Sequence, residues 1–161
     1  MKLLIRKMTP GDFDGVLPLQ HEIQALHESA LPGRFRPEAV SYPRQVFDQV
    51  VNDPDWRCAV CEAEGRIVGF LFAWIRRIRD HRNMPDADVL LIDDICVTAQ
   101  YRRRGVGRAL FDYAQAAAKE AGCDRSELSV WAFNEEAMAF YRAMGFAPQI
   151  IRMEKKTEAE R

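Results

Sequence analysis

The fold is decided by the stretch Leu90-Leu91-Ile92-Asp93-Asp94-Ile95-Cys96-Val97-Thr98-Ala99-Gln100-Tyr101-Arg102-Arg103-Arg104-Gly105-Val106-Gly107-Arg108. Its first eight residues form an apolar run that predicts a β-strand, and an alanine-rich helix is expected from Ala109 to Ala121. A helix start leaves backbone N–H groups unpaired and carries partial positive charge, so it binds phosphate well. Glycines at this point remove the Cβ atoms that would hold an anion away from the backbone. The stretch therefore predicts a site for the pyrophosphate of a nucleotide-like cofactor.

Length and composition indicate one globular domain over residues 1–161, with a frayed charged tail at 157–161. Lys and Arg total 23 against 24 Asp and Glu, so there is no global basic field to suggest a nucleic-acid partner. No apolar run approaches the roughly 20 residues of a membrane span, and the N-terminus lacks the pattern of a signal peptide. We therefore expect a cytoplasmic protein with no membrane partner.

The four cysteines are too few to indicate a disulfide scaffold in a chain of 161 residues, which also favours a reducing cytoplasm. Cys58 and Cys61 form a C-x-x-C, but they lie in a predicted strand from Trp56 to Glu62. A spacing of three then places the two thiols on opposite faces of the strand. No His residue stands at ligand spacing to them. We interpret both as structural thiols and expect no metal.

The rest of the chain alternates between strand and helix patterns. Strands are expected at Leu3–Lys7, Trp56–Glu62, Ile67–Arg77, Val89–Val97, Ser126–Trp131 and, as a last strand region, Phe146–Glu154. Helices are expected from Thr9 to about Glu28, near Pro43 to Asn52, at Ala109–Ala121, and from Asn134 to a stop at Gly145. Both alternating sets of Ile67–Arg77 are apolar, which predicts a central strand covered on both faces.

Two exposed segments have open interpretations. The loop Leu31–Pro37, with Arg34 and Phe35, is either a segment that gates a substrate site or a plain connection. The basic run Arg76–Arg82 fits a solvated hairpin tip better than a phosphate contact.

Known phosphate-binding motifs test the turn at 102–108. The dinucleotide fingerprint needs a third glycine where Leu110 stands, and no P-loop or G-x-S-x-G elbow occurs in the chain. The turn matches R-x-x-G-x-G at the start of a helix that follows a strand.

On these residues the chain resembles the GNAT superfamily of acyl-CoA-dependent N-acetyltransferases. The resemblance is carried by Ile95-Cys96-Val97, by the run Gln100–Arg108, and by Asn134-x6-Tyr141-Arg142-Ala143-Met144-Gly145-Phe146. The order of predicted elements also follows the family over nearly all 161 residues. The resemblance implies an α/β (α+β) fold with a mixed central sheet of about six to seven strands flanked by about four helices.

The resemblance implies acetyl-CoA as cosubstrate and assigns its binding residues. Backbone groups of Ile95, Cys96 and Val97 would pair with the pantetheine arm, because in this family a bulge leaves them without a partner strand. Asn134 would hydrogen-bond near the cofactor, and Tyr141 would lie near its sulfur. The pyrophosphate would be held by the turn and helix start, at Arg102, Arg103, Arg104, Gly105, Val106, Gly107 and Arg108.

The implied reaction is direct attack of an amine on the thioester carbonyl within a ternary complex. It needs a deprotonated amine, a stabilised oxyanion and a protonated leaving thiolate. A backbone N–H near Ile95 or Cys96 is the expected oxyanion donor, and Tyr141 is the candidate acid, with a core aromatic as its structural alternative. Cys96 is interpreted as packing rather than as a nucleophile, because no His lies near it in the sequence.

The general base is the least determined role. Many relatives place a Glu on the strand before Asn134, and here Ser129 occupies that place. Asp93 and Asp94 precede the expected bulge, and some polyamine-type relatives carry an acid at the Asp93 position. Strand alternation predicts that one of the two acids faces the site and the other the opposite layer. We expect Asp93 to act through water, with a salt-bridging or helix-capping acid as the alternative.

The acceptor is left open by the sequence. Four acids, Asp86, Asp88, Asp93 and Asp94, favour a small cationic amine, while a peptide N-terminus or a lysine side chain stays an alternative. Two other hypotheses are a non-catalytic acyl-CoA-binding sensor and a nucleotide-binding module that uses the arginine turn. The acyl-chain preference is undetermined, and the oligomeric state is open, with a homodimer as one alternative.

Overall fold

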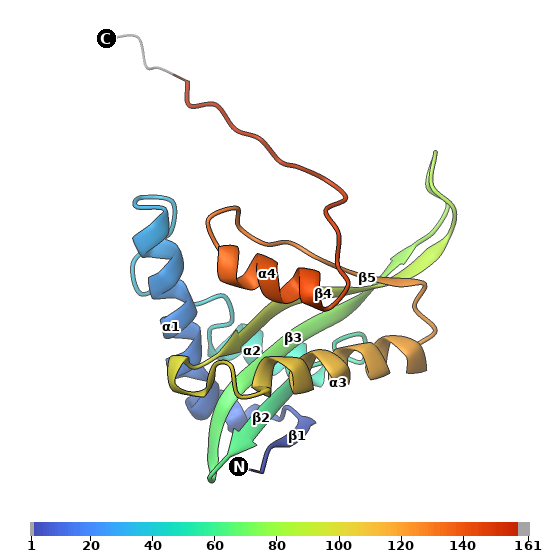
Figure 1. The fold of residues 1–161 in the computed structure, drawn as a ribbon. Helices are drawn as coiled ribbons and strands as arrows, with labels where there is room; N and C mark the ends of the chain where they lie inside the picture. Colours follow the sequence, from blue (N-terminus) through green and yellow to red (C-terminus); the bar gives the residue numbers. More distant parts are fainter. Residues whose placement is uncertain (1, 158–161) are drawn as a thin grey trace. The chain divides into compact units, whose positions relative to one another are not determined.

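The structure, a computed structural model, describes residues 2–157 and separates into two compact units, 1–129 and 130–161. Figure 1 shows the elements of both. Of the frayed tail expected at 157–161, residues 158–161 lie outside the described residues. The strands are β1 (Leu4–Lys7), β2 (Ala59–Ala63), β3 (Arg66–Ile78), β4 (Ala87–Val97) and β5 (Arg125–Leu128). The helices are α1 (Phe13–Ala30), α2 (Arg44–Asn52), α3 (Val106–Glu120) and α4 (Glu135–Ala143), with short 3-10 turns η1 (Pro10–Asp12) and η2 (Ala99–Tyr101).

The first unit is built on a mixed five-stranded sheet of order β1-β2-β3-β4-β5. Neighbouring strands are antiparallel except β4 and β5, which run parallel over Val89–Ile92 and Arg125–Leu128. The central strand β3 is buried on both faces through most of its length, because apolar residues occupy both sets of alternating positions. These features confirm the predicted α/β fold and the predicted central strand.

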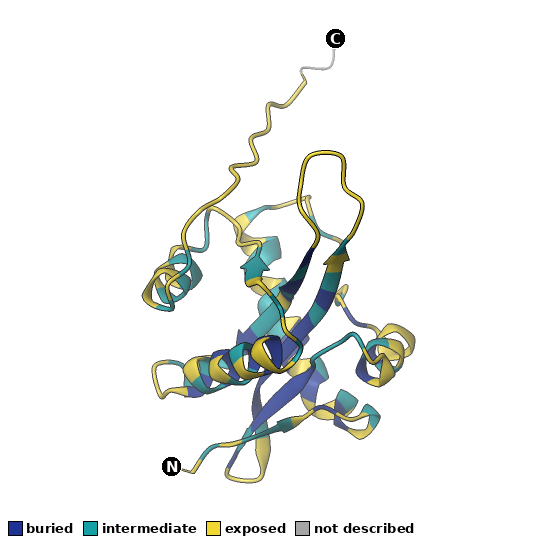
Figure 2. Cartoon of the chain, turned by 90° about the vertical axis from the view of Figure 1, so that its right-hand side faces the viewer, coloured by how far each residue is buried: buried dark blue, intermediate teal, exposed yellow. Residues whose placement is uncertain are grey.

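Helices cover both faces of this sheet, as Figures 1 and 2 show. On one face Phe70 and Phe72 pack with Val16 of α1 and Phe47 of α2 in one buried cluster. On the other face Gly69 lies against α3, at its residues Val106 and Leu110. Successive residues of a strand point to opposite faces, so from Gly69 to Phe72 the odd and even positions of β3 serve the two helical layers.

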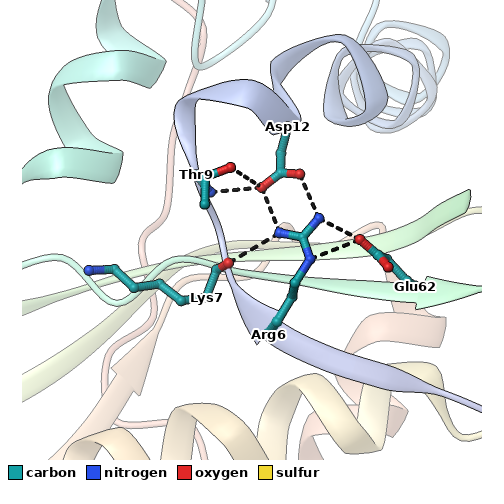
Figure 3. Close-up of polar contacts among 5 residues, drawn as sticks. All are labelled: Arg6, Lys7, Thr9, Asp12 and Glu62. Atoms are coloured by element: carbon teal, nitrogen blue, oxygen red, sulfur yellow. Dashed lines mark hydrogen bonds and ion pairs between the residues drawn. The ribbon is translucent and has the colours of Figure 1, made fainter.

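The start of α1 is tied to the sheet through Arg6 (Figure 3). Its guanidinium donates to both Asp12 carboxylate oxygens, at 2.8 and 2.7 Å, and from Nε to Glu62 on β2 at 2.8 Å. The Asp12 carboxylate also accepts from the N–H and the hydroxyl of Thr9, at 2.7 and 2.9 Å. The Arg6 bonds hold the pKa of Asp12 below its ordinary value. Thr9 and Pro10 therefore begin a helical segment as predicted, through the turn η1.

The strands β3 and β4 extend past the sheet into a hairpin whose connection, residues 79–86, is exposed throughout (Figure 2). Arg79 pairs with Asp88 at 2.6 Å and Arg77 with Asp55 at 2.7 Å. Both ion pairs lie on the surface, where their contribution to stability is small. The predicted solvated hairpin tip is therefore confirmed for residues 79–82, whereas residues 76–78 belong to β3.

In the second unit, α4 begins and ends as predicted. The Asn134 side chain accepts from the Ala137 N–H at 3.0 Å, which makes Asn134 the N-cap. Gly145 adopts φ 91°, and the Phe146 N–H reaches back to the Tyr141 carbonyl at 3.0 Å. This is the left-handed helix end that glycine favours.

The sheet has five strands rather than six or seven, because the strand region expected at Phe146–Glu154 does not form. Residues 146–157 have no regular secondary structure. Ile150 and Met153 are each 88% exposed. A strand needs a neighbour for its N–H and C=O groups, and no other strand lies in the described part of this unit. Across residues 2–157, none of the helices combines the length and apolarity needed to cross a membrane.

Replacing Gly69 by alanine is expected to destabilise the first unit. An added Cβ would lie 2.9 Å from the Cys96 carbonyl oxygen and 3.0 Å from the side chains of both Leu110 and Val106. Overpacking at such a contact costs about 1–3 kcal/mol. Urea unfolding should show this loss for Gly69→Ala. Gly11→Ala is the control, because its Cβ would meet only Thr9 Oγ1 at 3.7 Å; equal stability of the two variants would contradict the packing argument.

Candidate active site

The strand β4 contains a bulge at Asp93. Ile92 lies opposite Ala73 and Asp94 opposite Phe72, so Asp93 has no residue opposite it on β3. One extra residue in one strand of an antiparallel pair is the defining feature of a β-bulge. The two acids were expected to precede a bulge, and the structure places them within it.

The bulge brings the two carboxylates to the same face of the sheet. Asp94 pairs with Phe72, and paired residues share a face. The Asp93 carboxylate accepts a hydrogen bond from the Tyr42 hydroxyl, and the Tyr42 ring stacks on Phe72 with centroids 3.8 Å apart. The expectation that Asp93 and Asp94 face opposite layers is therefore wrong. Its physical reason is that the extra residue interrupts the alternation on which the expectation rested.

The electrostatics of this pair differ from those of a surface carboxylate. Burial, followed by the negative charge of Asp93, raises the pKa of Asp94 from 3.8 to about 7. Two like charges side by side disfavour the state in which both are ionised. Burial and the bond to Asp93 also raise the pKa of the Tyr42 hydroxyl, which therefore stays a neutral donor. The site thus holds a carboxyl group that exchanges its proton near neutral pH.

Sequence reasoning missed Tyr42. It lies in the connection between α1 and α2, is 3% exposed, and also makes an edge-on contact with Trp56 at 6.1 Å between centroids. Its main chain is held by the side chain of Gln20, which accepts from the Tyr42 N–H at 2.9 Å and donates to its carbonyl at 3.2 Å. The available signal was a glutamine at an inner position of a predicted helix, because a buried amide requires partners.

Beyond the bulge, one edge of β4 is left without a partner strand. On the β3 side, Ile95, Cys96 and Val97 pair with Leu71, Phe70 and Gly69. On the other side, β5 pairs only as far as Ile92. Among the strands of residues 2–157 no further one continues that ladder. An edge of this kind can hydrogen-bond an extended, amide-bearing ligand.

The turn after β4 leads into α3 through Gly105, which has φ 85° and acts as the N-cap. The Ala109 N–H donates to the Gly105 carbonyl at 2.9 Å and is the first bond of the helix ladder. The N–H groups of Val106, Gly107 and Arg108 precede it and have no acceptor within the helix. Arg103 also has a positive φ, 60°. The predicted glycine-bearing helix start is therefore present, and anion binding by its N–H groups stays a prediction.

The arginine side chains of this turn have separate surroundings. Arg102 donates from Nη2 to Glu22 on α1 at 3.1 Å and from Nε to the Val97 carbonyl at 3.1 Å. The Arg104 guanidinium lies 5.5 Å from the centre of the Tyr101 ring. Arg108 pairs with Asp112 at 3.2 Å on the exposed side of α3. Arg102 therefore braces the turn against α1.

Glu22 is a second residue that sequence reasoning missed. Besides Arg102, its carboxylate accepts from the Thr98 hydroxyl and from the Ala99 N–H, both at 2.8 Å. Three donors from the turn thus converge on one side chain of α1. No motif marks Glu22, because its partners lie more than 70 residues away and meet it only through packing.

Three of the four cysteines, Cys58, Cys61 and Cys96, are buried thiols. Cys96 donates from Sγ to the Leu19 carbonyl at 3.6 Å, and burial raises its pKa to about 12. A thiol with so high a pKa is a poor nucleophile, which agrees with a packing role. Burial likewise raises the pKa of Cys58 to about 12 and that of Cys61 to about 11. Cys58 belongs to the cluster beneath α1 and α2 and Cys61 does not, as expected for opposite faces.

The loop after α1 folds back on that helix. Phe35 stacks on His27 with centroids 5.3 Å apart, and Gln24 donates to the Arg36 carbonyl at 3.3 Å. Both contacts lie in the C-terminal half of α1. A gating role for Arg34 and Phe35 remains a prediction.

In the second unit the two predicted site residues lie on or next to α4. Asn134 is its N-cap, so its side-chain oxygen is engaged by Ala137. Tyr141 is half-buried, and its ring makes edge-on contacts with Phe140 at 5.4 Å and Phe146 at 5.9 Å. Both keep their predicted roles as proposals.

Asp94→Asn is expected to stabilise the protein at pH 8. Because the folded-state pKa of Asp94 is raised to about 7, the folded state loses stability as pH rises from about 4 to about 7. A neutral amide removes that penalty, on the order of 4 kcal/mol. Urea unfolding at pH 5 and pH 8 should show a gain that is larger at pH 8. Asp86→Asn, at an exposed carboxylate of the hairpin, controls for the lost charge; an equal gain there would contradict the assignment.

The chain is similar in sequence to known acetyltransferases. The acetyltransferase (GNAT) family profile matches residues 21–146. An uncharacterized N-acetyltransferase of Methanocaldococcus jannaschii is 29% identical over 145 residues, which are 88% of this chain and 59% of that protein. A thialysine N-epsilon-acetyltransferase of Bos taurus is 26% identical over 152 residues, 89% of this chain and 83% of that protein.

Solved structures show the same fold. A mutant of the BH1408 protein of Bacillus halodurans superposes with a TM-score of 0.92 at 25% identity, over 96% of this chain and 99% of that one. The aminoglycoside N-acetyltransferase AAC(6')-Iy, in complex with CoA, gives 0.71 at 18% identity, over 98% and 96%. The bulged strand, the glycine turn before α3 and the profile match over residues 21–146 lead to one conclusion: the chain belongs to the acetyltransferase (GNAT) family.

Proposed function

We propose that this protein is an acetyl-CoA-dependent N-acetyltransferase that acts on a primary amine, with a small cationic amine as the favoured acceptor. The proposal rests on two backbone features that follow one another in a single stretch of chain. They are the edge of β4 that has no partner strand and the N-terminus of α3. The first suits an amide-bearing arm and the second a pyrophosphate. Coenzyme A contains both groups in one chain.

The donor would bind along residues 95–108. Backbone groups of Ile95, Cys96 and Val97 pair with the pantetheine arm, and one N–H near Ile95 or Cys96 stabilises the oxyanion. The N–H groups between Arg103 and Arg108 hold the pyrophosphate, with the charges of Arg103 and Arg104 nearby. Arg102 contributes by bracing the turn, since its guanidinium already engages Glu22.

The acceptor would approach the face that carries Asp93 and Asp94. Two adjacent carboxylates favour a cationic amine over an acidic one. The relatives named above as thialysine and aminoglycoside acetyltransferases are named for amine acceptors. These names support the amine class, and a peptide amine is an alternative outcome of the tests below.

The reaction then follows from ordinary acyl-transfer chemistry. The ammonium group gives a proton through water to Asp93, and the freed amine nitrogen attacks the thioester carbon. The carbon–sulfur bond breaks as the amide forms, and the leaving thiolate takes a proton from the Tyr141 hydroxyl. The nitrogen then releases its second proton, which restores the Tyr141 hydroxyl through water. Asn134 hydrogen-bonds near the cofactor. Direct attack in a ternary complex derives most of its acceleration from positioning.

Acetyl-CoA binding is tested with two matched glycine variants of α3. Gly105 and Gly122 flank the helix, both have positive φ (85° and 70°), and neither has a neighbour within 4 Å of an added Cβ. Alanine at either should cost about 1–2 kcal/mol of backbone strain. Only Gly105→Ala should also weaken acetyl-CoA binding, by about tenfold or more.

Wild-type protein should show a stabilisation of about 2.7 kcal/mol at a hundredfold excess of acetyl-CoA over its Kd. Thermal shifts with acetyl-CoA, ATP and NADH measure this, and a stronger response to ATP or NADH would favour a nucleotide-binding module instead. Equal acetyl-CoA affinity in Gly105→Ala and Gly122→Ala would remove the turn from the binding site.

Tyr141→Phe tests the acid and the reaction itself. Loss of the hydroxyl should lower kcat about 100-fold or more while acetyl-CoA affinity changes little, because the ring is retained. Thiol release with a panel of small diamines, aminoglycosides and peptides measures turnover. Binding of acetyl-CoA without thiol release from any amine would identify a sensor, and unchanged kcat in Tyr141→Phe would refute the acid role.

A further inference from the structure

The Tyr42 hydroxyl is a buried partner of an exposed carboxylate. Tyr42 is 3% exposed, whereas Asp93 lies at the surface of the bulge. The hydroxyl donates to Asp93 Oδ2 across a sequence separation of 51 residues. Neither the phosphate turn nor the family motifs include Tyr42, so its position needs a separate explanation.

Three contacts fix this tyrosine so that its hydroxyl meets β4 at one point. Gln20 is 1% exposed and directs both its side-chain oxygen and nitrogen to the Tyr42 main chain. The ring lies flat on Phe72, at 12° between planes, and Trp56 closes its edge. A buried glutamine that bonds the backbone of one residue holds that residue in place. The loop is therefore held rigidly where it carries the hydroxyl.

The carboxylate that accepts from the Tyr42 hydroxyl, Asp93, is one of two adjacent acids. The bulge places Asp93 and Asp94 side by side on the same face, and two such carboxylates titrate together with one proton favoured on the pair. A hydrogen bond donated to one carboxylate stabilises the ionised form of that carboxylate. The donor therefore acts together with burial, the larger cause, to favour the shared proton on Asp94 rather than on Asp93.

We propose that Tyr42 is a positioning residue that keeps Asp93 ionised and so directs the proton shared by the two acids to Asp94. The inference rests on the proposed function for its consequence: Asp93 is then the free base that accepts a proton from the acceptor ammonium through water. When the proton arrives, both acids are neutral, and the exposed Asp93 returns it to solvent.

The groups that surround the two acids do not account for a proton exchanged near pH 7. The charges of Asp93 and Asp94, and the Cys58 thiol, interact electrostatically with the Tyr42 hydroxyl. The charge of Asp94 interacts in the same way with the Cys96 thiol. Burial raises the pKa of both thiols to about 12, so they stay neutral near pH 7. Glu22 of α1 and Arg102, which also act on Cys96, form an ion pair with each other. The raised pKa of Asp94, about 7, agrees with a proton held there.

The test is a carboxyl-carbon NMR titration of the full chain, in wild type and in Tyr42→Phe, which retains the ring. In wild type the Asp94 resonance should change with a midpoint near pH 7. In Tyr42→Phe the proton redistributes to Asp93, so the Asp94 midpoint should fall by about 0.5 or more on the pH scale. Tyr113→Phe, which removes a phenol hydroxyl from α3 on the other face, should leave the midpoint in place.

The pH dependence of turnover is a second measurement, and its midpoint should move in the direction opposite to that of the Asp94 resonance. If the base is Asp93, the acid limb of kcat/KM should move to higher pH in Tyr42→Phe, because Asp93 then carries the proton more often. An unmoved Asp94 midpoint in folded Tyr42→Phe overturns the inference. If Tyr42→Phe does not fold, Asp93→Asn is the second test. An Asp94 midpoint that stays near pH 7 in Asp93→Asn would show that the two acids are not coupled and would overturn the inference. Absence of thiol release from wild type would refute the proposed function and leave the titration result standing.

Discussion

One extra residue in β4 is the constraint on which the candidate site depends. Because Asp93 is inserted opposite β3 between Ala73 and Phe72, the strand changes its alternation at this point. Upstream of the bulge β4 pairs with both β3 and β5, and downstream of it the pairing with β5 has ended. The same insertion therefore brings two acids to one face and precedes the free strand edge where the proposed donor would lie.

The helix α1 holds the two halves of this arrangement. Gln20 fixes the Tyr42 loop beside the two acids, and Glu22 accepts hydrogen bonds from three donors of the turn before α3. Between them along β4, the Leu19 carbonyl accepts from the Cys96 thiol. Arg6 and Asp12 tie the beginning of the helix to the sheet. A helix held at these points gives both parts of the site a common, rigid reference.

Much of the architecture follows from local patterns. Apolar alternation on both faces identified β3 as central, and Gly105 and Asn134 marked the starts of α3 and α4. Each of these signals depends on residues close in sequence, where backbone sterics and capping act. The prediction of a strand at Phe146–Glu154 was wrong because strand formation depends on residues that are distant in sequence. Its apolar residues satisfy a local preference, but pairing requires a neighbour that local sequence does not supply.

By itself, the sequence determined the family, the order of elements as far as α4 and the glycine-bearing start of α3, because these reside in contiguous motifs. The tertiary structure decided which side chains meet. Tyr42 and Asp93 are 51 residues apart, and Glu22 and Arg102 are 80 apart, so only packing brings them together. It also decided that Asp93 and Asp94 share a face, since a bulge arises from the mismatch between two paired strands and is invisible in either strand alone.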